Sequence, residues 1–317
     1  MSKRTVAGEN GGAFANTKVV AGDNFTAELQ PHREGIVVCE SKFLLLGSRA
    51  PALETLLKAG VTRLRVGAEP GSRLLAHGRA AQVDVTEVRS RSDYLRFIQG
   101  SDFTHLVSSG VKWILPVSKL QEPHQTWINL HPALLPNHPG KHAITRALLD
   151  GGPFGVTCHL MVDSVDAGAV ISRRELQIDG GQYTAELVFR LLFRLEALAF
   201  ADAWSRRFSV LSPQPIGEGR DPYRRSDTLE LDLDEDLEDL RQRVFAHSAP
   251  GHFRRLPERF GGREVSSMSI VTGHTLSEFV QSLDECCVVQ DCDTGILMKL
   301  GGHLAWFAYP EVRRGES

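Results

Sequence analysis

The chain has 317 residues, 42% of them hydrophobic and 24% charged, and its formal net charge is −3. A chain of this length can bury a full core and has room for two domains. Its nearly balanced charge supplies no general field that would attract nucleic acid or an anionic membrane, so functions that depend on either are disfavoured.

The cysteines and the lack of long apolar runs indicate the cellular compartment in which the protein is expected. The five cysteines lie at positions 39, 158, 286, 287 and 292, without C-x-x-C spacing. This pattern predicts neither a disulfide framework nor a zinc site and favours a reducing environment. The sequence shows no signal-like apolar run at its start and no stretch near the ~20 apolar residues that cross a bilayer. We therefore expect a cytoplasmic protein that needs no metal.

The predicted elements begin with an extension, residues 1–34, which lacks steady periodicity and to which we assign no function. The run KFLLLGS (42–48) predicts a buried strand, Pro51 opens a helix that Gly60 ends, and VTRLRVGA (61–68) predicts the next strand. This order indicates an α/β fold with a Rossmann-like parallel sheet covered on both faces. The fingerprint G-x-G-x-x-G is absent, so no nicotinamide cofactor is implied.

Three further strands of this sheet are predicted by FTHLVSS (103–109), WINLH (127–131) and GVTCHLMV (155–162). Ligands of open α/β sheets bind outside the carboxyl ends of the strands, so function should gather where WINLH passes into a loop. A long helix, residues 184–207, follows with Thr184 as its N-cap. Its buried apolar face is predicted to carry Leu187, Leu191, Leu195 and Leu198.

Pro, Gly and charged residues cluster at 212–222 and predict a domain boundary. Beyond it Leu237, Leu240 and Val244 have helical spacing, and a small β unit is predicted by EVSSMSIV, CCVVQ, GILMKL and LAWFAY. The expected organisation is an extension at 1–34, a catalytic α/β domain at 35–211, and a linker with a smaller, mostly β domain at 212–317.

Asn129 and His131 stand two residues apart on the predicted strand WINLH, so their side chains point to the same face. An amide donor beside an imidazolium suits an oxyanion that forms when an amine attacks a carbonyl-level carbon. A neighbouring carboxylate would raise the pKa of the histidine. Asp163 and Asp166 are the candidates, since we expect the adjacent strand of the same parallel sheet to deliver them. His159 is expected to be a packed core histidine.

The stretch INLHPALLPNHPGKHAITRALLDGG, followed by GVTCHLMVDSVDAGAVI, resembles the 10-formyltetrahydrofolate-dependent formyltransferases. The shared pattern comprises N-x-H-P-x-L-L-P, a glycine four residues later, a helix at about 143–150, G-V-T-x-H, and a V-D-x-x-x-G segment that ends in Asp166 and Gly168. Upstream, WILP (113–116) is similar to the folate-pocket segment of the family. The resemblance covers roughly residues 42–210.

The resemblance implies that Asn129 holds the formyl oxygen, that His131 protonates or stabilises the tetrahedral oxyanion, and that Asp166 pairs with His131 and assists proton transfer through water. It also implies 10-formyltetrahydrofolate as co-substrate and no metal. Asp163 stands where the family often has Glu. The pterin pocket would be lined by Ile114, Leu115, Pro116, Met161, Val162 and Asp163.

The amine acceptor is less defined by the resemblance. Purine-pathway members end soon after the long helix, whereas this chain continues to residue 317. Methionyl-tRNA formyltransferases do continue, but the compact HPALLPNHPG and the acidic residues 230–239 lack the basic loop and surface of those enzymes. Amino-sugar N-formyltransferases resemble the chain in size. DPYRRSDT (221–228) loosely fits their Tyr-Arg-rich segment, in which Arg224 and Arg225 would meet a diphosphate, although a solvated surface pair is the plain alternative.

We therefore predict formyl transfer to a primary amine of a small molecule, and we favour a nucleotide-linked amino sugar. A methionyl-tRNA-type or hydroxyornithine-type transferase remains open. So do a hydrolase that uses water as acceptor and a folate-binding module without catalysis. We expect no membrane or nucleic-acid partner. A homodimer formed through the C-terminal unit is open, because its apolar strands are equally consistent with an internal core.

Overall fold

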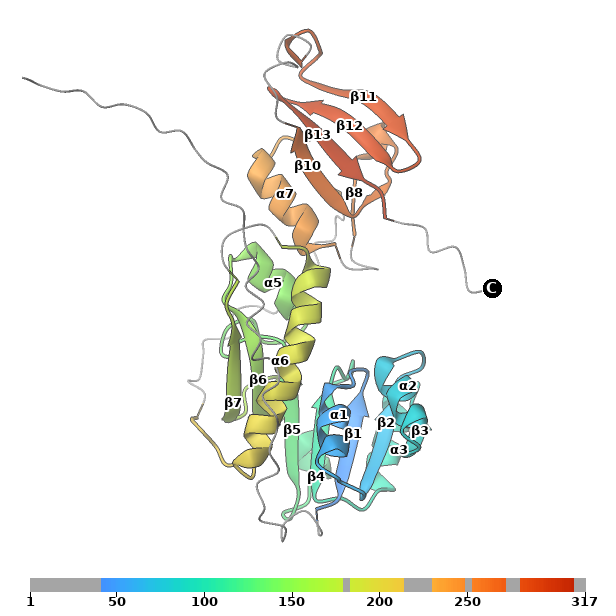
Figure 1. Ribbon diagram of the computed structural model, residues 1–317, viewed down its shortest axis with the longest axis vertical. Helices are drawn as coiled ribbons and strands as arrows, with labels where there is room; N and C mark the ends of the chain where they lie inside the picture. Colours follow the sequence, from blue (N-terminus) through green and yellow to red (C-terminus); the bar gives the residue numbers. More distant parts are fainter. Residues whose placement is uncertain (1–40, 179–182, 214–229, 249–252, 272–279, 311–317) are drawn as a thin grey trace, which may run out of the picture. The chain divides into compact units, whose positions relative to one another are not determined.

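The structure is a computed structural model that describes residues 41–178, 183–213, 230–248, 253–271 and 280–310. All of these belong to one compact unit, Val37–Ser317. Its first part is a seven-stranded sheet with the strand order β3-β2-β1-β4-β5-β6-β7 (Figure 1). The strands are β1 Phe43–Gly47, β2 Leu64–Ala68, β3 Asp84–Glu87, β4 His105–Ser109, β5 Thr126–His131, β6 Phe154–Leu160 and β7 Val170–Leu176.

Helices cover both faces of this sheet, as the apolar strands predict. One face packs under α1, α2 and α6, with Leu53 and Phe200 among the residues of that core. The other face packs under α3 and α4, with Tyr94 and Trp127 at its centre. The helices are α1 Pro51–Lys58, α2 Arg73–Ala80, α3 Arg91–Gln99, α4 Val117–Leu120, α5 Ala143–Leu149 and α6 Ala185–Ser205. The predicted α/β architecture with a mostly parallel sheet is thus confirmed.

The sheet is not parallel throughout. Strands β3, β2, β1, β4 and β5 run parallel, whereas β6 pairs antiparallel with β5, and β7 pairs antiparallel with β6. The expectation that an adjacent parallel strand delivers the catalytic carboxylate is therefore wrong. Alternating apolar residues indicate a strand but not its direction, because the side-chain period of two is the same in both orientations.

Helix α6 begins after Thr184, whose hydroxyl accepts a hydrogen bond from Leu187 N at 3.2 Å, so the predicted N-cap is confirmed. The predicted leucine face is wrong. Leu187 and Leu198 are 44% and 43% exposed, and Leu191 and Leu195 are half-buried. The side chains that α6 buries include three alanines, and the full set is Ala185, Val188, Leu192, Glu196, Ala199, Phe200 and Ala203. Small residues let the helix lie close to the sheet, and leucine spacing alone does not report that contact.

The C-terminal part opens with α7 Leu237–Ala246, which buries Leu240 and Val244 as its spacing predicts. Four antiparallel strands follow in the order β10-β13-β12-β11, with a two-stranded β8-β9 pair. The elements are β8 Arg254–Arg255, the 3-10 helix η1 Glu258–Phe260, β9 Glu264–Val265, β10 Ser267–Val271, β11 Cys286–Cys292, β12 Gly295–Leu300 and β13 His303–Ala308. These strands share their own core, which includes Met268, Ile296 and Phe307. A separate β-rich sheet set is therefore present, as predicted.

Hydrogen bonds join α7 to the first part of the chain. Gln242 donates to the carbonyl of Leu148, at the end of α5, at 2.7 Å. The hydroxyl of Ser248 accepts from the amide of Ala185, at the start of α6, at 3.0 Å. Among the described residues, none of the helices has both the length and the apolar character that a bilayer crossing requires.

Candidate active site

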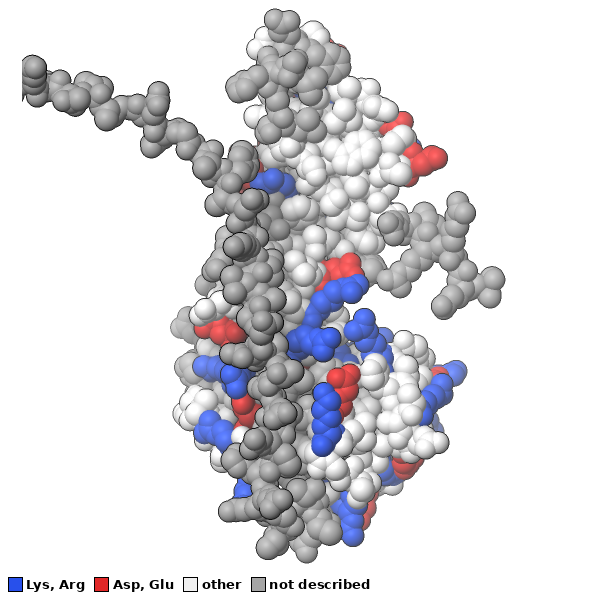
Figure 2. Space-filling view, in the orientation of Figure 1, with Lys and Arg blue, Asp and Glu red and all other residues white. Residues whose placement is uncertain are grey.

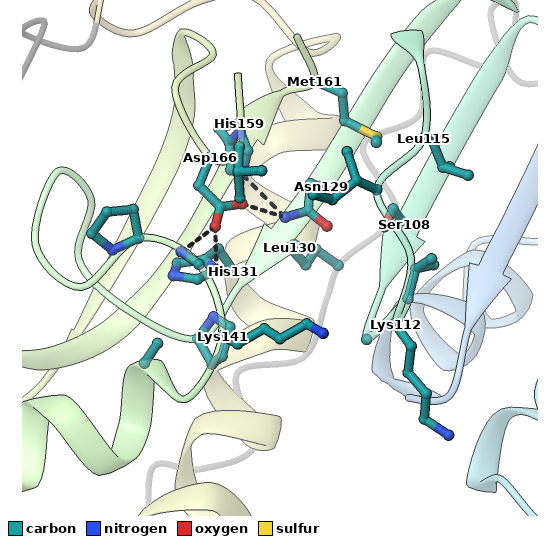
Figure 3. A pocket seen from close by; sticks show the side chains of 18 of the residues that line it. Ser108, Lys112, Leu115, Asn129, Leu130, His131, Lys141, His159, Met161 and Asp166 are labelled. Atoms are coloured by element: carbon teal, nitrogen blue, oxygen red, sulfur yellow. Dashed lines mark hydrogen bonds and ion pairs between the residues drawn. The ribbon is translucent and has the colours of Figure 1, made fainter. Parts of the chain in front are cut away.

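A cavity of about 700 Å³ lies at the carboxyl end of β5, where the sequence places Asn129 and His131 (Figure 3). Its walls come from the segment after β4, from β5, from the loop before α5 and from the loop after β6. Ligands are expected at this edge of an open α/β sheet, and the cavity is where the sequence predicts function.

The carboxylate of Asp166 comes from the loop between β6 and β7. This loop turns back along the sheet edge: Met161 N donates to Trp127 O at 2.9 Å and Leu160 N donates to Ala169 O at 2.9 Å. The turn needs Gly168, because a Cβ atom there would lie 1.8 Å from the carbonyl oxygen of Leu160. Asp166 itself adopts a left-handed backbone with φ of 54°. A returning loop, and not a strand end, thus brings Asp166 to β5.

Asp166 stands at the centre of the predicted triad. Its Oδ2 lies 3.3 Å from His131 Nδ1 and accepts from the amide of Gly140 at 2.7 Å. Its Oδ1 accepts from Asn129 Nδ2 at 3.2 Å and lies 3.4 Å from His159 Nε2. Figure 3 shows Asn129, His131 and His159 all directed at this carboxylate.

Ionisation of Asp166 is favoured by these neighbours. Burial alone would raise the pKa of Asp166, but the interactions with His131, His159 and the Gly140 amide outweigh burial and hold the pKa well below its usual range. The carboxyl group is therefore a carboxylate at neutral pH.

His131 is 5% exposed, and burial lowers its pKa more than Asp166 raises it. The resting ring is therefore neutral at pH 7, in contrast to the imidazolium expected from its carboxylate partner alone. Both ring nitrogens nevertheless face oxygen acceptors, since Nε2 lies 2.9 Å from the carbonyl oxygen of His138. Only the doubly protonated ring can donate to both, so these two acceptors are placed to hold a proton that His131 takes up.

The amide of Asn129 contacts two other side chains of the site. Its nitrogen, the donor expected to face the formyl oxygen, points at Asp166 Oδ1 and at His159 Nε2, both at 3.2 Å. His159 Nδ1 lies 2.8 Å from the carbonyl oxygen of Leu160, and its Nε2 faces both Asn129 Nδ2 and Asp166 Oδ1. His159 therefore belongs to the site, beyond the core role expected of it.

The opposite wall of the cavity is apolar. Five of the residues expected in the pterin pocket line this cavity, namely Ile114, Leu115, Met161, Val162 and Asp163. Ile114 is 63% exposed and Val162 is 45% exposed, so an apolar surface stays open. The Asp163 carboxylate accepts from Ser118 N at 3.0 Å, which together with the Ser118 side chain lowers its pKa.

One residue predicted for the pocket lies outside the cavity lining, and two predicted arginines are not described. Pro116 is not among the residues that line the cavity and instead forms the N-cap of α4. Arg224 and Arg225 lie outside the described residues. Within the described ranges, no group of three or more His, Cys, Asp or Glu side chains is arranged to hold a metal ion.

Four contributors to this site are not recognised as site residues from the sequence. His159 faces Asn129 across the β5–β6 pairing, and Arg49, Lys112 and Lys141 reach the cavity from three separate loops. An antiparallel assignment for β6 would have exposed the first, because it places His159 opposite Asn129. The three basic residues carry no local pattern, and only the tertiary fold brings them together.

Comparison with known proteins supports the resemblance. The family model described as formyl transferase matches residues 87–203. The methionyl-tRNA formyltransferase of Listeria welshimeri is 33% identical over 132 residues, which cover 41% of this chain and 42% of that protein. The methionyl-tRNA formyltransferase of Thermotoga sp. strain RQ2 is 26% identical over 225 residues, 64% of this chain and 70% of that protein.

A solved structure has a similar fold. The N-formyltransferase of Helicobacter canadensis, in complex with folinic acid and dTDP-3-aminofucose, aligns with a TM-score of 0.61 and 12% identity over 85% of this chain and 100% of that one. The match to the Listeria enzyme spans less than half of that enzyme's length. The sequence matches and the fold together confirm the resemblance to this superfamily.

Proposed function

We propose that this chain, whose sequence and fold resemble those of the formyltransferase superfamily, transfers a formyl group from 10-formyltetrahydrofolate to a primary amine of a small molecule. The observation that carries the proposal is the convergence of Asn129, His131 and Asp166 at one end of an open cavity. A preorganised amide donor, an imidazole and a carboxylate suit an acyl transfer to an amine.

The apolar wall supports a folate co-substrate. Ile114, Val162 and Val165 line the cavity and are 63%, 45% and 45% exposed, so they form an apolar surface on which a flat heterocycle can pack. Asp163 borders that wall and provides a carboxylate acceptor for N–H groups of a pterin. Bound 10-formyltetrahydrofolate supplies the formyl carbon and leaves as tetrahydrofolate. Ile114, Leu115, Met161, Val162 and Asp163 are the residues we assign to it.

The polar wall holds and moves protons. Asn129 Nδ2 has two hydrogens, so one can stay on Asp166 while the other donates to the formyl oxygen in place of His159. His131 rests neutral and takes up the proton that the attacking amine loses, because Asp166 and the His138 carbonyl stabilise the doubly protonated ring. The same ring then returns a proton to the departing nitrogen, directly or through water.

For the acceptor we favour a nucleotide-linked amino sugar. The Helicobacter canadensis enzyme was crystallised with dTDP-3-aminofucose, and the similarity of fold supports an acceptor of that class. On the face drawn in Figure 2, basic and acidic side chains of the seven-stranded part are interspersed, and the net charge is −3. Such a surface suits a small acceptor better than a polyanion.

A methionyl-tRNA acceptor is the second candidate, because the relatives from Listeria welshimeri and Thermotoga are methionyl-tRNA formyltransferases. The two acceptors differ in salt dependence. Each phosphate contact of a tRNA releases counterions, so kcat/KM for tRNA falls steeply with added salt, whereas kcat/KM for a small amine changes little.

The test is tetrahydrofolate release from 10-formyltetrahydrofolate in the presence of nucleotide-linked amino sugars, glycinamide ribonucleotide, hydroxyornithine or charged initiator tRNA, with a reaction lacking amine. We expect release that depends on an amino sugar. His131→Ala should lower kcat by about two to four orders of magnitude, because the acid–base contribution of the imidazole is lost. The exposed His303→Ala on β13 is the matched control and should retain full turnover.

Each outcome separates the candidate functions. Release without amine indicates a hydrolase, and release only with tRNA selects the second acceptor. Binding of folate without turnover under every condition indicates a binding module. Near-normal turnover of His131→Ala would overturn the proposed mechanism.

A further inference from the structure

A buried arginine reaches the catalytic strand from the loop after β1. Arg49 is 7% exposed, and its Nη2 donates to the carbonyl oxygen of Leu130 at 2.6 Å. Leu130 lies between Asn129 and His131, and it pairs with Ser109, the last residue of β4. Strand β4 ends at this register position, so it has no further backbone amide to donate to the Leu130 carbonyl. The guanidinium of Arg49 donates there instead.

Two groups hold the guanidinium in this position. Arg49 Nε lies 3.1 Å from Ser109 Oγ and 3.3 Å from Glu196 Oε2, and Ser109 Oγ donates to Glu196 Oε1. The ring of Phe193 lies 5.9 Å from the guanidinium carbon. The network thus joins the β1 loop, the end of β4 and helix α6 to one backbone atom of the catalytic strand.

The Arg49–Glu196 ion pair is unusual at a buried position between a helix and a sheet. Glu196 is 1% exposed on a face of α6 whose other buried residues are apolar, and burial raises the pKa of its carboxyl group. Removing two charges from water costs free energy that their attraction only partly returns, so apolar residues would hold α6 to the sheet at least as well. A buried pair at this point is better explained by what the guanidinium does to β5.

We propose that Arg49, held by Glu196 and Ser109, is a positioning residue that fixes the Leu130 carbonyl and thereby sets Asn129 and His131 against Asp166. The inference rests on the proposed function, because it takes Asn129, His131 and Asp166 to be the groups that carry out formyl transfer. Arg49 acts through the strand and makes no step of the chemistry itself.

The arrangement also has an electrostatic consequence at His131. The charged and titratable groups that face His131 are Asp166, His159 and Arg49, and the positive charge of Arg49 lowers the pKa of His131. Glu196 partly neutralises that charge. Removing Arg49 should therefore raise the pKa of His131, whereas removing the charge of Glu196 should lower it further. Opposite shifts in the two variants would show that the charges of this network act at the imidazole of His131.

The test follows the imidazole of His131 by NMR titration in the full chain, for wild type, Arg49→Met, Arg49→Lys and Glu196→Gln. We expect the His131 pKa to rise in Arg49→Met, to fall in Glu196→Gln, and to stay near wild type in Arg49→Lys, which keeps the charge. This measurement needs no substrate. It therefore remains informative if formyl transfer is not found, and the failure of the two proposals can be told apart.

Kinetics test the positioning role itself. Arg49→Met should lower kcat about 10- to 100-fold with little change in KM, because a displacement of about 1 Å at reacting groups has an effect of that order. Arg49→Lys should recover part of the loss through a single hydrogen bond to Leu130. Asp202→Asn breaks the exposed pair between Asp202 of the same helix and Arg174 of β7, and it is the matched control, with kcat unchanged.

A double variant separates positioning from folding. Arg49→Met with Glu196→Leu removes both charges and leaves apolar side chains near Phe193, so the protein should keep a melting temperature close to that of the wild type. Its kcat should nevertheless stay as low as that of Arg49→Met, since Leu130 has lost its donor. Wild-type kcat in a folded double variant, or a His131 pKa that does not respond to Arg49→Met, would overturn the proposal.

Discussion

At the scale of single residues, burial and charge act in opposite directions on His131. The ring lies 3.3 Å from a carboxylate, yet it is 5% exposed, and burial decides the direction in which its pKa moves. Asp166 shows the reverse result, because three donors outweigh its burial. The pair therefore rests as a neutral imidazole beside a carboxylate, which is the form that can accept a proton from an amine.

A pH dependence of stability follows from His131. Its folded pKa lies below the unfolded value of about 6.5, so just below pH 6.5 the unfolded chain binds a proton that the folded chain does not. Stability is therefore present above about pH 6.5 and falls as the pH decreases toward the folded pKa, by at most about 1.4 kcal/mol per pH unit for each such group. Burial lowers the pKa of His105 as well, which adds to the slope. Asp166 contributes a constant amount here, since its stabilisation is lost only in stronger acid.

The measurement is the melting temperature at pH 7.5 and pH 5.5 for wild type and His131→Gln. We expect the wild type to melt at a lower temperature at pH 5.5, and His131→Gln to show a smaller difference between the two values. Retention of the full difference in His131→Gln would assign the slope to other groups.

At the scale of elements, the loop between β6 and β7 determines whether the site exists. Asp166 is held two residues before Gly168, whose missing Cβ allows the chain to pass the carbonyl of Leu160. Backbone cannot move as a flexible side chain does, so a methyl group at this position displaces the loop.

Gly168→Ala should therefore lower stability by about 1–3 kcal/mol and reduce kcat together, because it moves Asp166 away from Asn129 and His131. Urea unfolding and the tetrahydrofolate release assay measure the two effects. Gly302→Ala is the control, since no atom lies within 4 Å of its built Cβ, and it should change neither quantity. An active Gly168→Ala protein would show that the loop can adopt another path.

The elements also show what sequence could predict and what it could not. Strands β1, β2, β4, β5 and β6 and helix α6 were located from apolar runs and caps, since these signals are local. The direction of β6 and the buried face of α6 depend on what each element packs against. On α6, the four leucines of the predicted face outweigh the alanines in apparent apolar character, yet Ala199, Phe200 and Ala203 are buried against the neighbouring core. Asn129, His131 and Asp166 were predicted through their motif, whereas His159 and Arg49 required the three-dimensional neighbours.

The orientation of α6 can be checked by a pair of substitutions. Phe200 is fully buried, so Phe200→Ala should lower the free energy of unfolding by about 3–5 kcal/mol. Leu198 is 43% exposed, so Leu198→Ala should lower the free energy of unfolding by less than about 1 kcal/mol, although Leu198 belongs to the predicted leucine face. Urea unfolding followed by fluorescence measures both. A larger loss for Leu198→Ala than for Phe200→Ala would show that the predicted leucine face is the buried one.

At the scale of the whole molecule, the described C-terminal part is joined to the seven-stranded part near the cavity. Helix α5 begins at Ala143, directly after the cavity residues Lys141 and His142, and its last turn accepts hydrogen bonds from Gln242 of α7. Ala246 of α7 packs in the same core as Ile144 and Val188. The C-terminal part therefore supports the helix that borders the site, while its own sheet keeps a separate core.

Ser248 provides a test of this support. Its hydroxyl accepts from the amide of Ala185, and it is 7% exposed, so Ser248→Ala leaves a buried amide at the start of α6 without this partner. An unsatisfied buried donor lowers stability by about 1–3 kcal/mol. Ser205→Ala is the matched control, because its hydroxyl bonds the carbonyl of Asp202 at an exposed position and its loss should change stability by less than about 0.5 kcal/mol. In urea unfolding the Ser248→Ala midpoint should fall while the slope stays at the wild-type value, since both parts then still unfold together. A reduced slope, or separate transitions by two probes, would mean that the two parts fold independently and that α7 does not stabilise the catalytic part.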